Sequence, residues 1–128
     1  MSTSKLAILG CGNIGSAIAK GLAKSGMTPA DITLTRRKME SLSELKQAGF
    51  QTSADNANAV QNSEILLLTV GPSQLMDLLD EISSSLNADH LLISIVSGVS
   101  IAEIQAKVGK DIPIIRAMPN TAAALCES

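Results

Sequence analysis

Three glycines near the start of the chain, Gly10, Gly12 and Gly15, form a GxGxxG pattern between a short apolar run and a helical pattern. In such turns the first glycine permits the tight turn and the second lets the backbone approach a pyrophosphate. The third lets the helix pack closely on the strand. The helix dipole and the free amides of the first helical turn then face the anion, although an ordinary strand-to-helix turn is the alternative. The residues predicted to bind a dinucleotide here are Leu9, Gly10, Cys11, Gly12, Asn13, Ile14 and Gly15.

Three cations follow the next predicted strand, residues 32–35. The end of this strand lies about twenty residues past the glycine turn, where an NAD-binding unit usually places an acid on the ribose 2′-hydroxyl. Here the positions carry Arg36, Arg37 and Lys38 instead. Arginine can hold a phosphate with its planar fork, and Thr35 can add a hydroxyl donor. We therefore predict that Thr35, Arg36 and Arg37 bind the 2′-phosphate of NADP, with NADPH preferred and NADH possible; a solvated basic turn is the alternative.

Further loops are expected to meet these residues at one edge of a sheet. Right-handed crossovers place the carboxyl ends of parallel strands on the same edge, where ligands bind at the switch point of the sheet. Asn56 is placed to reach the cofactor, and Asn120 with Thr121 to contact the nicotinamide side; for both asparagines a turn-forming role is the alternative. The contacts predicted from these loops are Asn56, Thr69, Val70, Gly71, Pro72, Ser97, Gly98, Asn120 and Thr121.

The elements that must position these loops alternate between strand and helix patterns. Residues 65–70 and 91–95 are nearly continuous apolar runs, as buried parallel strands are, and residues 39–48 have helical spacing. Ser100 with Glu103 has the form of a capping box. The pattern predicts an α/β fold, a Rossmann-type doubly wound, mostly parallel sheet of about six strands with helices on both faces. The buried face of the first helix is predicted to be Ile14, Ala17, Ile18, Gly21 and Leu22.

Composition argues against several other classes. The chain has 128 residues, which is enough for one domain. Its net charge is −2, whereas a nucleic-acid binder normally carries an excess of basic residues. Its apolar runs are too short to span a membrane, and residues 1–5 lack a signal-peptide core, so we expect a cytoplasmic location. No residues have metal-ligand spacing, and there is no GxSxG motif. We predict no catalytic residue: His90 is expected at the surface and Cys11 as a small filler in the glycine turn.

The chain resembles the pyrroline-5-carboxylate reductases in four signatures that occur in the family's order. These signatures are residues 10–15, 70–72, 94–101 and 116–121. The last contains Met-Pro-Asn-Thr and is the most specific, and the similarity runs over essentially the whole chain. Two positions depart from the family pattern. Gly71 stands where the family has a lysine, which removes a cation near the cofactor, and Ala122 stands where the family has a proline.

The resemblance implies an NAD(P)H-dependent enzyme that reduces the cyclic imine 1-pyrroline-5-carboxylate to L-proline. It implies that residues 1–121 form a Rossmann dinucleotide-binding domain. Residues 122–128 would begin a helical C-terminal domain, missing here, that makes a homo-oligomer and holds the imine. We expect the 128 residues alone to be inactive, because hydride transfer needs the imine held close to the nicotinamide. The alternatives are another small Rossmann reductase of the prephenate or 3-hydroxyacid dehydrogenase type, and a stand-alone, non-catalytic NADP(H)-binding module.

Overall fold

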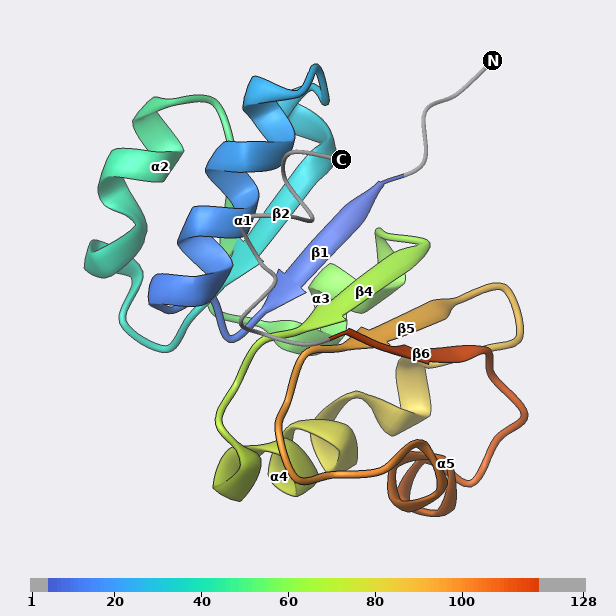
Figure 1. Ribbon diagram of the computed structural model, residues 1–128. Coiled ribbons are helices and arrows are strands. Elements are labelled where there is room, and N and C mark those ends of the chain that lie inside the picture. The colour runs from blue at the N-terminus through green and yellow to red at the C-terminus, as the bar shows by residue number, and fades with distance from the viewer. Residues whose placement is uncertain (1–4, 118–128) are drawn as a thin grey trace.

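The computed structural model describes residues 5–117, which form a single six-stranded sheet (Figure 1). Every strand pairing is parallel, and the strand order is β3-β2-β1-β4-β5-β6. The predicted doubly wound parallel sheet is therefore confirmed. The strands are β1 (Leu6–Leu9), β2 (Ile32–Thr35), β3 (Gln51–Ser53), β4 (Ile65–Leu68), β5 (Leu91–Ser94) and β6 (Ile114–Arg116).

Five α-helices connect the strands of this part of the chain: α1 (Asn13–Lys24), α2 (Ser43–Gln47), α3 (Asn56–Gln61), α4 (Pro72–Ile82) and α5 (Ile101–Val108). Single 3₁₀ turns lie at Pro29–Asp31, Met39–Leu42 and Ser83–Ser85. The predicted capping box of α5 is confirmed, because Ser100 Oγ accepts from the Glu103 amide at 3.1 Å and Glu103 Oε1 accepts from the Ser100 amide at 3.2 Å.

The helices lie on both faces of the sheet, with α1 and α2 on one face and α3, α4 and α5 on the other (Figure 1). Each face has its own apolar core. On the first, Ile18 and Ala19 of α1 and Leu45 of α2 pack with side chains of β1 and β2. On the second, Leu75 and Leu79 of α4 pack with β4 and β5 and with α3 and α5. This two-sided burial explains why β1 and β4 read as continuous apolar runs.

Three local predictions are correct only in part. Of the predicted face of α1, Ile18 is buried and Leu22 packs against the core, whereas Ile14 is 44% exposed; the other buried residues of this helix are Gly15 and Ala19. The helix predicted over residues 39–48 begins as a 3₁₀ turn and becomes α-helical only at Ser43. The strand predicted over residues 65–70 ends at Leu68, so its last two residues belong to the following loop.

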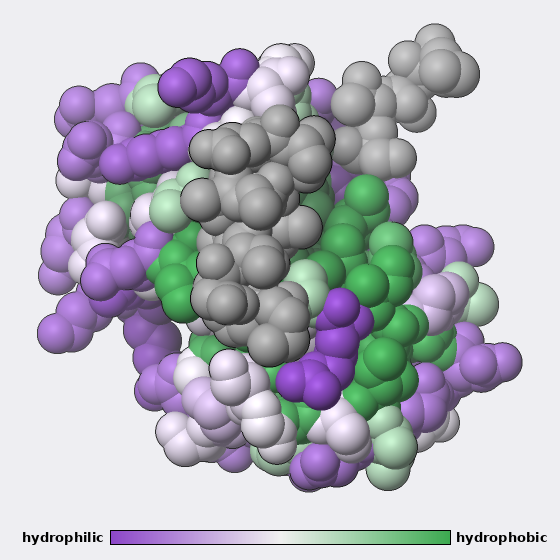
Figure 2. Space-filling view, in the orientation of Figure 1, coloured by the Kyte–Doolittle hydropathy of each residue, from purple (hydrophilic) through white to green (hydrophobic). Residues whose placement is uncertain are grey.

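Apolar surface lies beside β4, β5 and β6 in Figure 2. Ile115 of β6 is 49% exposed, and Ile65, Leu91 and Ile93 are half-buried. Side chains alternate along a strand, so these four residues share the face that carries α1 and α2. Within residues 5–117, that face is therefore better covered over β1 and β2 than over β5 and β6.

Candidate functional site

A cavity of about 710 Å³ lies where the first four strands end. Strand β1 pairs with β2 on one side and β4 on the other, so the chain reverses its winding between β1 and β4. Such a switch point leaves a crevice at the carboxyl ends of the strands. The lining residues are Gly10, Gly12, Thr35, Arg36, Arg37, Lys38, Asn56, Thr69, Val70, Gly71, Gln74, Asp77, Leu78 and Glu81.

Two glycines of the turn are required by packing inside the protein. Gly10 has φ +77°, and a Cβ there would lie 2.1 Å from Val70 Cγ1. A Cβ on Gly15 would lie 3.1 Å from both Ile8 Cγ2 and Thr69 Oγ1. The structural roles predicted for these two glycines, a tight turn and close helix-to-strand packing, are therefore confirmed.

Gly12 has a different environment. A Cβ built there meets no atom within 4 Å, so protein packing does not explain the glycine. Gly12 precedes α1 as its N-cap and lines the cavity. No side chain of the described residues caps this helix, so its first-turn amides remain for another partner. Open space in front of helix amides fits the approach of a pyrophosphate.

The cations after β2 form one wall of the cavity. Arg36, Arg37 and Lys38 are all exposed and all line it. Their backbone is held in place, because the Arg36 amide donates to the Ser53 carbonyl at 3.3 Å and the Cys11 amide donates to the Thr35 carbonyl at 2.7 Å. The second bond joins the glycine turn to the end of β2. Lys38 belongs to this wall although the predicted site stops at Arg37.

Cys11 lies beneath the turn and is fully buried. Burial raises the pKa of its thiol, while a hydrogen bond from Ser16 and the nearby Arg36 charge oppose that rise. A buried thiol of raised pKa is a weak nucleophile. The predicted role as a filler residue agrees with this environment.

Thr35 and Asn56 are joined by a hydrogen bond that uses the proton of the Thr35 hydroxyl. Thr35 is 1% exposed; its hydroxyl accepts from the Gly10 amide at 3.0 Å and donates to Asn56 Oδ1. Asn56 Nδ2 in turn donates to Glu81 Oε2 at 3.0 Å. A hydroxyl has one proton to give. For Thr35 to donate to a phosphate, as expected from the sequence, its proton would have to leave Asn56.

Helix α4 supplies the opposite wall, which the sequence reasoning missed. Gln74, Asp77 and Glu81 follow one another at helical spacing and line the cavity with Leu78. Gln74 Oε1 also accepts from the Gly71 amide at 3.3 Å, which fixes the start of α4. The spacing of 3 and 4 residues was a signal that these side chains share a face. Identifying that face as the cavity wall needed the position of α4.

The other predicted contacts lie around the cavity rather than in its lining. Leu9, Cys11 and Gly15 are buried behind it, and Asn13, Ile14 and Pro72 are exposed at the starts of α1 and α4. Ser97 and Gly98 are exposed in the loop after β5. Asn120 and Thr121 lie outside the described residues. The cavity does bring together Gly10, Gly12, Thr35, Arg36, Arg37, Asn56, Thr69, Val70 and Gly71.

His90 is buried, which corrects the prediction of a surface role. It is 5% exposed; Nδ1 accepts from the Asn87 amide and Nε2 bonds the Val60 carbonyl, both at 3.0 Å. It precedes β5, at the end of the sheet opposite the cavity. Within residues 5–117, no group of histidine, cysteine and acidic side chains is arranged to hold a metal ion. Each helix of this part is too short or too polar to cross a membrane.

Comparison with known proteins places the chain in a family. Residues 5–98 match the family described as NADP oxidoreductase, coenzyme F420-dependent. The chain belongs to this family. It is 46% identical over 124 residues to pyrroline-5-carboxylate reductase 1 of Dictyostelium discoideum, which spans 96% of this chain and 22% of the relative. It is 42% identical to pyrroline-5-carboxylate reductase 2 of the same organism, over 99% of this chain and 44% of the relative.

Solved structures agree with this assignment. A pyrroline-5-carboxylate reductase from Coxiella burnetii superposes with a TM-score of 0.87 at 32% identity, over 91% of this chain and 44% of that one. The Plasmodium falciparum enzyme, solved with NADP bound, gives a TM-score of 0.80 at 25% identity, over 92% and 43%. The chain thus corresponds to the N-terminal NADP-binding domain of pyrroline-5-carboxylate reductases, and it spans less than half the length of these relatives.

Proposed function

We propose that this chain binds NADP(H) as the cofactor-binding part of a pyrroline-5-carboxylate reductase. The observation that carries the proposal is identity of 46% and 42% to two such enzymes over almost the whole chain. The reaction is the reduction of the C=N bond of 1-pyrroline-5-carboxylate to give L-proline. Contacts to the imine and the surface of a homo-oligomer are assigned to the part of the relatives that extends beyond the matched region.

The residues around the cavity fit the cofactor. The open space at Gly12 and the first-turn amides of α1 suit the pyrophosphate. Arg36 and Arg37, with Lys38 beside them, suit the 2′-phosphate at the position where an NAD-binding unit carries an acid. When bound, NADPH supplies the hydride, and the protein's part is to orient the cofactor and the imine. Gly71 leaves the loop after β4 without a cation, so we assign the phosphate contacts to the loop after β2.

A chimera tests the reductase assignment. The 128 residues of this chain are joined to the portion of D. discoideum pyrroline-5-carboxylate reductase 2 that follows the matched region. NADPH oxidation is then followed with and without 1-pyrroline-5-carboxylate. We expect oxidation that depends on the imine, and little from the 128-residue chain alone, because the imine must be held near the nicotinamide.

Two outcomes distinguish the alternatives. A folded chimera that binds NADPH but does not oxidise it with the imine supports a non-catalytic NADP(H)-binding module. A chimera that oxidises NADPH with other imines or with 3-oxo acids, but not with 1-pyrroline-5-carboxylate, supports a different small reductase. A Gly12→Ala chimera is the matched control, since its oxidation rate should fall at limiting NADPH if the cavity holds the cofactor.

A further inference from the structure

Four residues from four separate segments form one line of hydrogen bonds along the cavity. The Gly10 amide donates to Thr35 Oγ1 at 3.0 Å, Thr35 Oγ1 donates to Asn56 Oδ1, and Asn56 Nδ2 donates to Glu81 Oε2 at 3.0 Å. The line runs from the glycine turn through the end of β2 and the start of α3 to α4. All four residues line the cavity.

Glu81 at one end and the Gly10 amide at the other determine the directions of the bonds in this line. A carboxylate only accepts hydrogen bonds, so the atom of Asn56 that faces Glu81 must be Nδ2. The Asn56 oxygen then faces Thr35, whose single proton must point toward it. Thr35 is left as the acceptor for the Gly10 amide. The chemistry of the neighbouring groups thus determines which way the Asn56 amide is turned.

Without the acceptor on Glu81, the Asn56 amide would be held in this orientation by Thr35 alone. Turned over, its nitrogen would donate to Thr35 Oγ1, and its oxygen would lie on the side of Glu81 and the cavity. The Nδ2 group has two hydrogens, and Glu81 takes one of them. The second remains as a donor at a half-buried position in the cavity that also contains Arg36 and Arg37. An amide oxygen at the same place would repel a phosphate oxygen.

We propose that Glu81 is a positioning residue for cofactor selection. It holds the Asn56 amide so that an N–H, rather than the carbonyl oxygen, is offered to the group on the 2′ position of the cofactor's ribose. This inference rests on the proposed binding of NADP(H) at the cavity. It extends that proposal to Glu81 on α4, which acts through Asn56. An acidic residue is then part of a site that selects a phosphate group.

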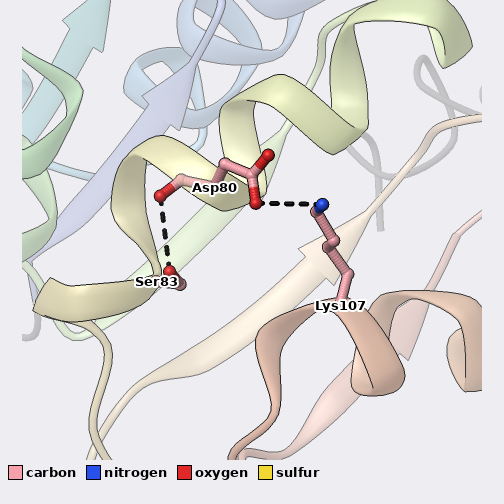
Figure 3. A network of polar contacts seen from close by, with 3 residues as sticks. All are labelled: Asp80, Ser83 and Lys107. Carbon is pink, nitrogen blue, oxygen red and sulfur yellow. Dashed lines mark hydrogen bonds and ion pairs between the residues drawn. The ribbon is translucent and has the colours of Figure 1, made fainter.

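The test uses two ligands that differ by a single phosphate, adenosine 2′,5′-bisphosphate and adenosine 5′-monophosphate. Each is titrated calorimetrically into the 128-residue chain and into Glu81→Ala and Glu81→Gln variants. Asp80→Ala is the matched control. Asp80 is the neighbouring acid on α4, but its carboxylate pairs with Lys107 of α5 at 3.0 Å and its carbonyl accepts from Ser83 Oγ at 3.3 Å (Figure 3). It is absent from the cavity lining.

We expect Glu81→Ala to weaken binding of the bisphosphate by about tenfold, the effect of one lost hydrogen bond to a charged group. Binding of the monophosphate should change by less than about twofold, since it has no 2′-phosphate. Glu81→Gln keeps an acceptor oxygen for Asn56 and should bind the bisphosphate at least as tightly as the unmodified chain. Asp80→Ala should leave the ratio of the two affinities unchanged.

Several results would overturn the inference alone. One is that Glu81→Ala leaves the binding of both ligands unchanged, or weakens both equally, as a purely structural role would. Another is that Glu81→Gln binds the bisphosphate as weakly as Glu81→Ala, which would show that the acceptor oxygen is not what matters. Thermal unfolding of each variant is measured alongside. If Glu81→Ala fails to fold, the titration of Glu81→Gln with the two ligands remains as the test. If the unmodified chain binds neither ligand, the proposed function fails and the inference fails with it.

Discussion

The side chain of Val70 fills the space that a side chain on residue 10 would need. A Cβ on Gly10 would lie 2.1 Å from Val70 Cγ1, and Gly10 has φ +77°, a left-handed conformation that disfavours other residues. Gly10 follows β1 and Val70 follows β4, so the two residues lie close together at the edge of the sheet where the cavity opens. The glycine turn and the position of Val70 both require that residue 10 has no side chain.

Replacing Gly10 by alanine should therefore destabilise the fold by about 2–5 kcal/mol. This sum combines about 1–2 kcal/mol for the left-handed backbone with about 1–3 kcal/mol for overpacking. Gly98→Ala is the control, since Gly98 has φ +78° but no atom lies within 4 Å of an added Cβ. This variant should lose only the stability that the left-handed backbone costs. Urea unfolding measures both. Equal losses in the two variants would contradict the role given to Val70.

Gly12 and Gly15 should respond in opposite ways to the same change. Gly12→Ala should leave the free energy of unfolding within about 0.5 kcal/mol of the unmodified chain, because the new methyl group meets no neighbour. It should nevertheless weaken NADPH binding. Gly15→Ala should destabilise the fold by about 1–3 kcal/mol, because its Cβ would press on Ile8 and Thr69. Unfolding and NADPH titration of both variants test this; a stable Gly12→Ala that binds NADPH normally would remove the reason for assigning Gly12 to the cofactor.

Cys11 predicts a pH dependence of stability. Burial raises the pKa of its thiol in the folded chain, so above about pH 8.5 the unfolded chain ionises this thiol first. The stability that depends on the protonated thiol is fully present below the pKa of the thiol in the unfolded chain. It is lost as the pH rises through the pKa of the thiol in the folded chain. The free energy of unfolding should thus fall more steeply between about pH 8 and 10 in the unmodified chain than in Cys11→Ala. Parallel pH profiles for the two proteins would rule this out.

His90 should matter for stability and not for cofactor binding. Alanine at this position removes the acceptor of the Asn87 amide and one of the two donors to the Val60 carbonyl, which keeps the Ser63 amide at 3.2 Å. We expect a loss of about 1–3 kcal/mol in His90→Ala, measured by urea unfolding. The exposed neighbour Asp89→Ala should change stability by less than about 0.5 kcal/mol. If His90→Ala instead kept its full stability and bound NADPH more weakly, the structural role assigned to His90 would be contradicted.

The sequence was sufficient for the fold because its strong patterns agree with one another. The apolar run of β4, the Ser100–Glu103 capping box and the glycine turn each specify one element, and their order leaves one topology. Boundaries were less certain. Residues 69 and 70 have strand-like side chains, yet they lie in the loop after β4. There the single proton of Thr69 Oγ1 is shared between the Leu9 and Gly10 carbonyls, at 3.0 and 3.1 Å.

The candidate site was only partly predictable. The glycine turn and the cations are local patterns, and the cavity brings them together. The wall of α4 was missed because exposed polar residues such as Gln74, Asp77 and Glu81 read as an ordinary solvated face until the helix is placed. The hydrogen bond between Thr35 and Asn56 was not foreseen for a similar reason, because the two residues lie 21 positions apart and no local pattern shows that they meet.

The central claim is that Arg36 and Arg37 recognise a 2′-phosphate, and one titration tests it most directly. NADPH and NADH are titrated calorimetrically into the 128-residue chain, an Arg36→Ala/Arg37→Ala variant, and a Lys20→Ala/Lys24→Ala control that removes the same charge from the exposed side of α1. We predict tighter binding of NADPH to the unmodified chain and to the control. The double arginine variant should lose that preference, at about 1.5–3 kcal/mol. Equal affinity of the unmodified chain for both cofactors, or a preference that survives in the arginine variant, would contradict the claim.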